Sequence, residues 1–288
     1  MKARVISACI FVPVVLAASV LGGWPFLALV LVICGITAWE FGHIFDQHDN
    51  VRVPLILLVI SVIVLILARW FIGIDASHRI LTLCIMGAML CGTVLCEQEV
   101  PKSALSFTVL TTGMVYIGWL GGYMISLRML PDGMLNFLLV LALIWVYDVG
   151  AFFVGCAIGK HKMFRIVSPK KSWEGFFGGI AVTVLVAVLA ERFIPAVDAI
   201  LNMKQIIILA LIISIAAPLG DFGESMIKRC YGQKDSSNLI PGHGGFFDRF
   251  DSCFFAMPAA YYFFELIRFT QSPIPNPQSP IPINLFMI

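Results

Sequence analysis

The chain has 288 residues, of which 60% are hydrophobic and only 12% are charged, with a net charge of +2. A mean hydropathy of +0.96 excludes an ordinary water-soluble domain and turns the question from domain count to membrane-span count. Uncharged runs of about 18 or more residues, enough to cross roughly 30 Å of hydrocarbon, recur along the chain. We predict an all-α integral membrane protein with nine spans: 5–22, 24–41, 53–74, 79–96, 104–130, 134–158, 176–196, 203–222 and 250–269.

Residues 1–130 are predicted to form the N-terminal and middle transmembrane helices, with tight connectors and no dense polar cluster. The first run also resembles a secretory signal peptide, but the runs behind it favour a retained helix. Small residues let helices approach closely in lipid, so they are expected to pack within the chain or to form a homodimer. They recur in the fourth and fifth runs (Gly87, Ala88, Gly92, Gly113, Gly118, Gly121 and Gly122).

Residues 131–271 carry most of the candidate chemistry. Asp148 interrupts the sixth run, where a carboxylate near mid-membrane costs about 2.5–3.5 kcal/mol. It is either a functional group or a buried hydrogen-bonding group. The same run leads directly into a cationic loop, 159–175.

Within that loop, Ser168 and Pro169 predict a helix start, with Ser as N-cap and Pro at the first helical position. Lys170 and Lys171 would then lie in the first turn, where unpaired N–H groups and the helix dipole favour a phosphate. The alternative is an ordinary cytoplasmic loop attracted to anionic lipid head groups. Glu174 and the glycines that follow it favour a specific site.

The second polar block, 223–251, continues the eighth run. Asp221, Glu224, Ser225 and Lys228 are spaced i, i+3, i+4 and i+7, which places them on one helical face. Mg²⁺ uses one or two carboxylates and completes its shell with water and substrate phosphates. Asp221 and Asp248 could supply those carboxylates, while three cations could neutralise phosphate oxygens (Lys228, Arg229 and Lys234).

The turn 241–245 lets main chain approach a ligand closely. His243 could donate to phosphate, act as a base or serve only the turn, and Asp248 and Asp251 follow on the entering helix. The Pro-rich tail 272–288 is predicted to be extended, without a catalytic role.

The second block reads Ser225-x-Ile227-Lys228-Arg229-x₄-Lys234-Asp235-x-Ser237-x₂-Ile240-Pro241-x-His243-Gly244-Gly245-Phe246-x-Asp248-Arg249-Phe250-Asp251. This pattern resembles the signature of phosphatidate cytidylyltransferases, also called CDP-diacylglycerol synthases. Ser168-Pro169-Lys170-Lys171-Ser172-x-Glu174-Gly175 and the region of Asp148 also resemble that family. Residues 1–130 agree with it in membrane character and length alone.

The resemblance implies cytidylyl transfer from CTP to phosphatidic acid in the bilayer, giving CDP-diacylglycerol and pyrophosphate for phospholipid biosynthesis. It implies Mg²⁺, alone or with a second cation, and no nucleic-acid partner. The expected catalytic residues are Asp221, Asp248, Lys228, Lys234 and His243. The expected substrate-binding residues are Ser168, Lys170, Lys171, Ser172, Glu174, Ser225, Arg229, Asp235 and Arg249. Asp221 and Asp248 are the expected metal ligands, supported by Asp148 and Asp251.

The distribution of positive charge predicts the orientation. A cytoplasmic N-terminus and cytoplasmic loops 159–175 and 223–251 place 13 of the 19 basic residues inside, in a multi-pass protein of the cell (inner) membrane. Two other functions fit parts of this sequence: a lipid-linked kinase of the polyprenol type, and a secondary transporter with Asp148 on an ion path. Transporters usually bind near the midplane within inverted repeats, whereas this chain concentrates its charge at one face.

Overall fold

The computed structural model describes residues 2–46, 53–95, 100–240 and 244–271, and these are almost entirely helical. The N-terminal half contains α1 (Lys2–Leu21), α2 (Gly23–Asp46), α3 (Leu55–Phe71), α4 (Ile74–Leu95), α5 (Val100–Gly113), the π-helical turn η1 (Met114–Trp119) and α6 (Tyr123–Met129). The C-terminal half contains α7 (Gly133–Ile158), β1 (Lys162–Phe164), β2 (Ser168–Ser172), α8 (Trp173–Phe193), α9 (Pro195–Asp198), α10 (Met203–Cys230) and α11 (Phe247–Gln271).

Six stretches of the described chain are long and apolar enough to cross a membrane. They are Gly23–Asp46, Ile74–Val94, Ser103–Met129, Gly133–Ile158, Trp173–Phe193 and Met203–Cys230. Two further apolar helical stretches are shorter, Phe11–Leu21 and Leu55–Phe71. The structure therefore agrees with a polytopic, nearly all-α membrane protein, whereas the number nine stays a prediction. The proline-rich tail 272–288 lies outside the described residues.

The prediction of a helix starting at Ser168 and Pro169 is wrong. Ser168–Ser172 instead forms β2, which pairs antiparallel with β1 in a hairpin. Helix α8 begins only after β2, at Trp173. Its N-cap is Ser172, which keeps an extended backbone (φ −126°, ψ 155°) and whose hydroxyl accepts the Gly175 N–H at 3.2 Å. Lys170 and Lys171 therefore lie on a strand that precedes α8, outside its first turn.

The glycines of the fifth predicted span pack inside the chain. A Cβ on Gly113 would lie 2.8 Å from Leu58, and one on Gly118 would lie 2.7 Å from Leu65, both on α3. Such close approach is the usual role of small residues between membrane helices. The surface at Gly87 is open, with nothing within 4 Å of an added Cβ, and the homodimer stays a prediction.

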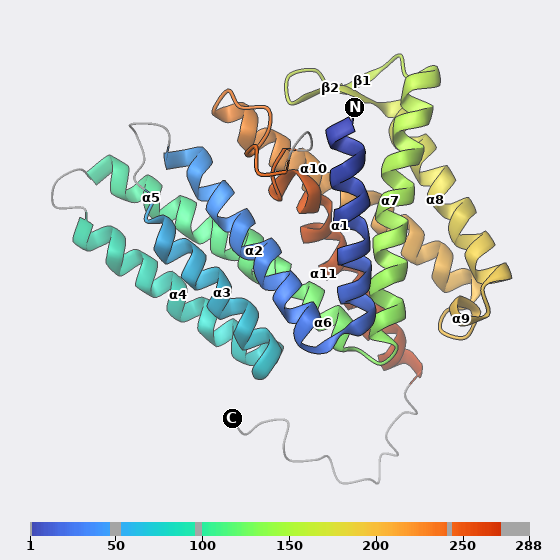
Figure 1. Cartoon of the computed structure of the whole chain (residues 1–288), viewed down its shortest axis with the longest axis horizontal. Coiled ribbons are helices and arrows are strands. Elements are labelled where there is room, and N and C mark those ends of the chain that lie inside the picture. Colours follow the sequence, from blue (N-terminus) through green and yellow to red (C-terminus); the bar gives the residue numbers. More distant parts are fainter. Residues whose placement is uncertain (1, 47–52, 96–99, 241–243, 272–288) are drawn as a thin grey trace, which may run out of the picture.

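The polar segments gather at one end of the bundle. The β1–β2 hairpin lies at the same end as the start of α1, while α9 and the connection from α6 to α7 lie at the opposite end (Figure 1). Helices α7, α10 and α11 come together between these ends. This arrangement brings the two polar blocks of the sequence next to each other.

Candidate active site

The site forms where α10 and α11 cross at contact distance. A Cβ on Gly220 would lie 2.1 Å from the carbonyl oxygen of Asp251, so only glycine allows this crossing. The hydroxyl of Tyr116, on the π-helical turn η1, donates to the Gly220 carbonyl at 3.1 Å and fixes the same point from the N-terminal half. Asp221 is the next residue on α10, and it is therefore held beside Asp251.

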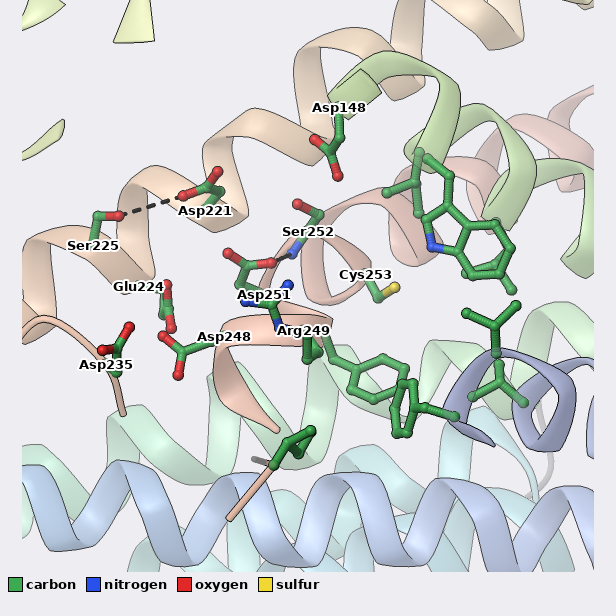
Figure 2. A pocket seen from close by; sticks show the side chains of 18 of the residues that line it. Asp148, Asp221, Glu224, Ser225, Asp235, Asp248, Arg249, Asp251, Ser252 and Cys253 are labelled. Atoms are coloured by element: carbon green, nitrogen blue, oxygen red, sulfur yellow. Dashed lines mark hydrogen bonds between the residues drawn. The ribbon is translucent and has the colours of Figure 1, made fainter. Parts of the chain in front are cut away.

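Three carboxylates meet at this crossing. One oxygen each of Asp221, Glu224 and Asp251 lies within 4.8 Å of the others, and Figure 2 shows these side chains around one pocket. Glu224 is only 2% exposed and its Oε1 has no hydrogen-bond partner among the described residues. A buried unpaired carboxylate oxygen is costly, and a bound cation would relieve that cost. An all-oxygen donor set is the kind that Mg²⁺ prefers, so these residues fit the expected metal.

We call the pocket around these carboxylates the acidic cavity. It has a volume of about 480 Å³, and its polar wall includes Asp148, Asp221, Glu224, Asp248 and Asp251. Its other wall is apolar and comes from α1, α7 and α11 (Phe11, Val12, Val15, Leu141, Ile144, Trp145 and Phe250). One pocket therefore combines a cluster of anionic groups with a surface suited to hydrocarbon.

A second pocket, the basic cavity, lies on the hairpin side and has a volume of about 600 Å³. Its cations are Lys162, Lys170 and Lys171. Asp148 and Asp221 line both cavities, so the two pockets adjoin at these carboxylates. Lys171 forms an ion pair with Asp221, and its Nζ lies 4.2 Å from the centre of the Phe222 ring. The pair joins the hairpin to α10.

Lys228 neutralises part of the acidic cluster. Its ammonium lies 2.8 Å from Glu224 Oε2 and also pairs with Asp248 Oδ1. The other oxygen of Asp248 accepts the Ser236 N–H at 2.9 Å, the Ser236 hydroxyl at 2.7 Å and the Gly245 N–H at 2.7 Å. Asp248 thus ties Ser236 to Gly245, and its assignment as a metal ligand stays a prediction.

The other predicted site residues differ in their position relative to the two cavities. Ser225, Asp235 and Arg249 line the acidic cavity, and the Ser225 hydroxyl donates to Asp221 Oδ1 at 3.4 Å. Ser172 lines the basic cavity. The remaining residues line neither cavity: Ser168, Glu174, Arg229 and Lys234. His243 lies outside the described residues.

Two of these outlying residues brace the hairpin. Glu174 accepts the His161 N–H at 3.2 Å and lies 2.5 Å from His161 Nδ1. Arg229 donates to the carbonyls of Val167 at 3.4 Å and Gln233 at 2.9 Å. The Glu174 contacts tie the start of the hairpin to α8, and the Arg229–Val167 contact ties the hairpin to the end of α10.

Sequence reasoning missed Glu40 on α2, whose carboxylate accepts hydrogen bonds from Ser237 and from the N–H of Phe247. A signal was present, because Glu40 is a charged residue in an otherwise apolar run and such residues are seldom without a role. The helical spacing in the sequence also predicted the face on which Glu224 lies, but it did not identify Glu224 as a metal ligand. The unpaired Oε1 of Glu224 becomes visible only when α10 and α11 are packed together.

In a membrane protein, a site that combines clustered carboxylates and lysines with an apolar wall is typical of enzymes that act on the phosphate groups of lipids. The chain belongs to the Cytidylyltransferase family, whose sequence pattern matches residues 2–267. It is 30% identical over 274 residues to the phosphatidate cytidylyltransferase of Bacillus subtilis, covering 92% of this chain and 98% of the relative. It is 31% identical over 293 residues to the phosphatidate cytidylyltransferase of Synechocystis sp., covering 92% and 96%. That of Staphylococcus haemolyticus is 31% identical over 262 residues, covering 90% and 96%.

Proposed function

We propose that this chain transfers a cytidylyl group from CTP to phosphatidic acid, giving CDP-diacylglycerol and pyrophosphate. The family membership and the names of the relatives support this reaction. The structural observation that carries it is the pair of adjoining cavities that share Asp148 and Asp221. A reaction between two phosphate-bearing substrates, one of them a lipid, needs two such adjoining sites.

The reaction mainly requires that the two substrates be positioned and that the charge on their phosphates be neutralised. A phosphate oxygen of phosphatidic acid attacks the α-phosphorus of CTP, and the bond from that phosphorus to the bridging oxygen breaks as pyrophosphate leaves. The lipid phosphate is already a competent nucleophile, so no covalent enzyme intermediate is required. Bringing two polyanions together in the correct orientation supplies much of the rate enhancement.

In this proposal Lys170 and Lys171 of the basic cavity hold the triphosphate, and the apolar wall of the acidic cavity holds the start of the acyl chains. Lys171 would orient phosphate oxygens next to Asp221, with which it pairs in the structure. Mg²⁺ held by Asp221, Glu224 and Asp251, with Asp248 and Asp148 nearby, would neutralise charge on the phosphates. Lys228 would keep the surrounding carboxylates in place.

One assay tests the reaction and separates it from its rivals. Purified protein is incubated with phosphatidic acid, each of the four nucleoside triphosphates, and either Mg²⁺ or EDTA. We expect pyrophosphate and CDP-diacylglycerol with CTP and Mg²⁺. Release of a nucleoside diphosphate would indicate a lipid kinase instead, and the absence of any product would contradict an enzyme acting on these substrates.

The orientation can be tested by sided labelling. We propose that the active site and the N-terminus face the cytoplasm of an inner membrane, because 13 of 19 basic residues then lie inside. Thiol probes should reach single cysteines introduced into 160–172 and 230–240 from the cytoplasmic side, and a cysteine introduced into the tail 272–288 from the other side. Reaction of the tail and of 230–240 from the same side would mean that the predicted span count is wrong by one.

Surface lysines should behave differently from the buried lysine of the site. Lys160 and Lys162 are exposed on the hairpin, whereas Lys228 is buried. Lys160→Ala and Lys162→Ala should each weaken attraction to anionic lipid by about 1 kcal/mol at low salt, and the effect should vanish at high salt. Vesicle binding and turnover measured across a salt series test this. A Lys160→Ala defect as large as that of Lys228→Ala at every ionic strength would contradict it.

A further inference from the structure

Glu40 is a fully buried carboxylate on α2. No cation pairs with it among the described residues, and its hydrogen-bond partners are two serine hydroxyls and two backbone N–H groups, from residues 236–237 and 246–247. The Ser237 hydroxyl donates to Oε1 at 2.5 Å and the Ser236 hydroxyl lies 3.2 Å from Oε2. The N–H groups of Phe246 and Phe247 donate at 3.1 Å and 2.7 Å.

The two backbone contacts explain how this charge is accommodated. Helix α11 begins at Phe247, and the first N–H groups of a helix have no partner within the helix. They also carry the positive end of the helix dipole, which favours a negative group. Glu40 therefore acts as the N-terminal anion of α11, although it comes from a helix 206 residues earlier in the sequence.

The contacts continue from Glu40 into the acidic cluster. The Ser236 hydroxyl lies between Glu40 and Asp248, 2.7 Å from Asp248 Oδ2. Asp248 pairs with Lys228, and Lys228 pairs with Glu224 in the group that fits the metal. Displacing the Glu40 carboxylate should therefore disturb the position of Asp248 and the charge balance around Lys228.

Gly245 makes this approach possible. A Cβ at this position would lie 2.1 Å from the Ser236 hydroxyl oxygen and 2.3 Å from Glu40 Oε1. The backbone at Gly245 thus lies directly against Glu40, with no room for a side chain at this position.

We propose that Glu40 is a positioning residue for cytidylyl transfer, anchoring the start of α11 and the Ser236–Ser237 segment so that Asp248 and Lys228 are held at the site. This inference rests on the proposed function for its effect on turnover, but the anchoring itself does not. Glu40 lines neither the acidic nor the basic cavity, so its effect is exerted through Ser236 and Asp248.

Kinetics of Glu40→Gln provide the first test. The amide keeps the size of the side chain but loses the charge and turns one acceptor into a donor that faces N–H groups. We expect kcat to fall about 10²-fold, the usual cost of a misplaced catalytic group, with KM for CTP within about twofold. The matched control is Thr37→Val, which alters a buried polar side chain on the same helix whose hydroxyl has no partner among the described residues. It should retain the kcat of the unmodified protein.

A second variant covers the case in which Glu40→Gln folds poorly. Ser237→Ala removes the hydroxyl that donates to Glu40 Oε1 and should lower kcat by up to about tenfold. The double variant should be no slower than Glu40→Gln alone, because both changes act on one contact. Independent, multiplying losses would overturn the inference, as would a normal kcat in Glu40→Gln.

Limited trypsin digestion of the detergent-solubilised protein tests the anchoring without any assay of activity. Lys234 is exposed beside the anchored segment, and Lys160 and Lys162 on the hairpin provide an internal reference. Cleavage after Lys234, relative to the hairpin, should be faster in Glu40→Gln and unchanged in Thr37→Val. Unchanged cleavage in Glu40→Gln would overturn the anchoring. An unmodified protein without cytidylyl transfer would instead overturn the proposed function, and the digestion result would still decide whether Glu40 anchors the segment.

Discussion

Asp221→Asn should abolish Mg²⁺-dependent turnover while the protein still inserts and purifies. Asp221 is shared by both cavities, belongs to the three-carboxylate group and pairs with Lys171. A neutral amide would weaken metal binding and leave Lys171 without its counter-charge. At about 4 kcal/mol for the lost charge neutralisation, kcat should fall about a thousandfold.

Steady-state kinetics over a Mg²⁺ series measure this loss, and Asp198→Asn provides the matched control. Asp198 is an exposed carboxylate on α9, at the opposite end of the bundle from the hairpin (Figure 1). Asp248→Asn should also lose turnover, but because Asp248 accepts hydrogen bonds from Ser236 and Gly245 it should loosen their segments as well. Near-normal activity of either site variant would contradict its assignment.

Lys228→Ala should lower both kcat and stability. Lys228 is 7% exposed and is the cation between Glu224 and Asp248. Removing one partner of a buried ion pair costs about 3–5 kcal/mol, because the charge that remains is no longer compensated. The four carboxylates around the crossing would then repel one another, and the geometry that receives the phosphates would be lost.

Thermal unfolding in detergent and initial-rate kinetics test this second prediction together. Lys204→Ala is the matched control, since Lys204 is an exposed cation on the same helix. We expect Lys228→Ala to lower Tm and kcat at every ionic strength, and Lys204→Ala to change neither. A Lys228→Ala protein with normal Tm and normal kcat would show that another cation neutralises the cluster.

The sequence alone determined the membrane character, the nearly all-helical fold and the family. Long uncharged runs leave a chain few alternatives to spanning helices, because every backbone polar group in lipid must be satisfied internally. The motif from Ser225 to Asp251 carries the chemistry in one stretch, so the resemblance could be seen without any long-range contact. The face of Asp221, Glu224 and Lys228 likewise followed from helical spacing alone.

The tertiary structure decided which of these groups meet. Ser168 and Pro169 carry a helix-start signal in the sequence, and only the pairing of β1 with β2 shows that the helix begins after Ser172. Asp221 and Asp251 become neighbours because Gly220 lets α10 cross α11 at contact distance. Glu40 reaches Ser236 and the start of α11 from the N-terminal half, a contact that local patterns cannot reveal because it joins residues about 200 positions apart. Spacing along one helix fixes which residues share a face, whereas packing between helices fixes which faces share a site.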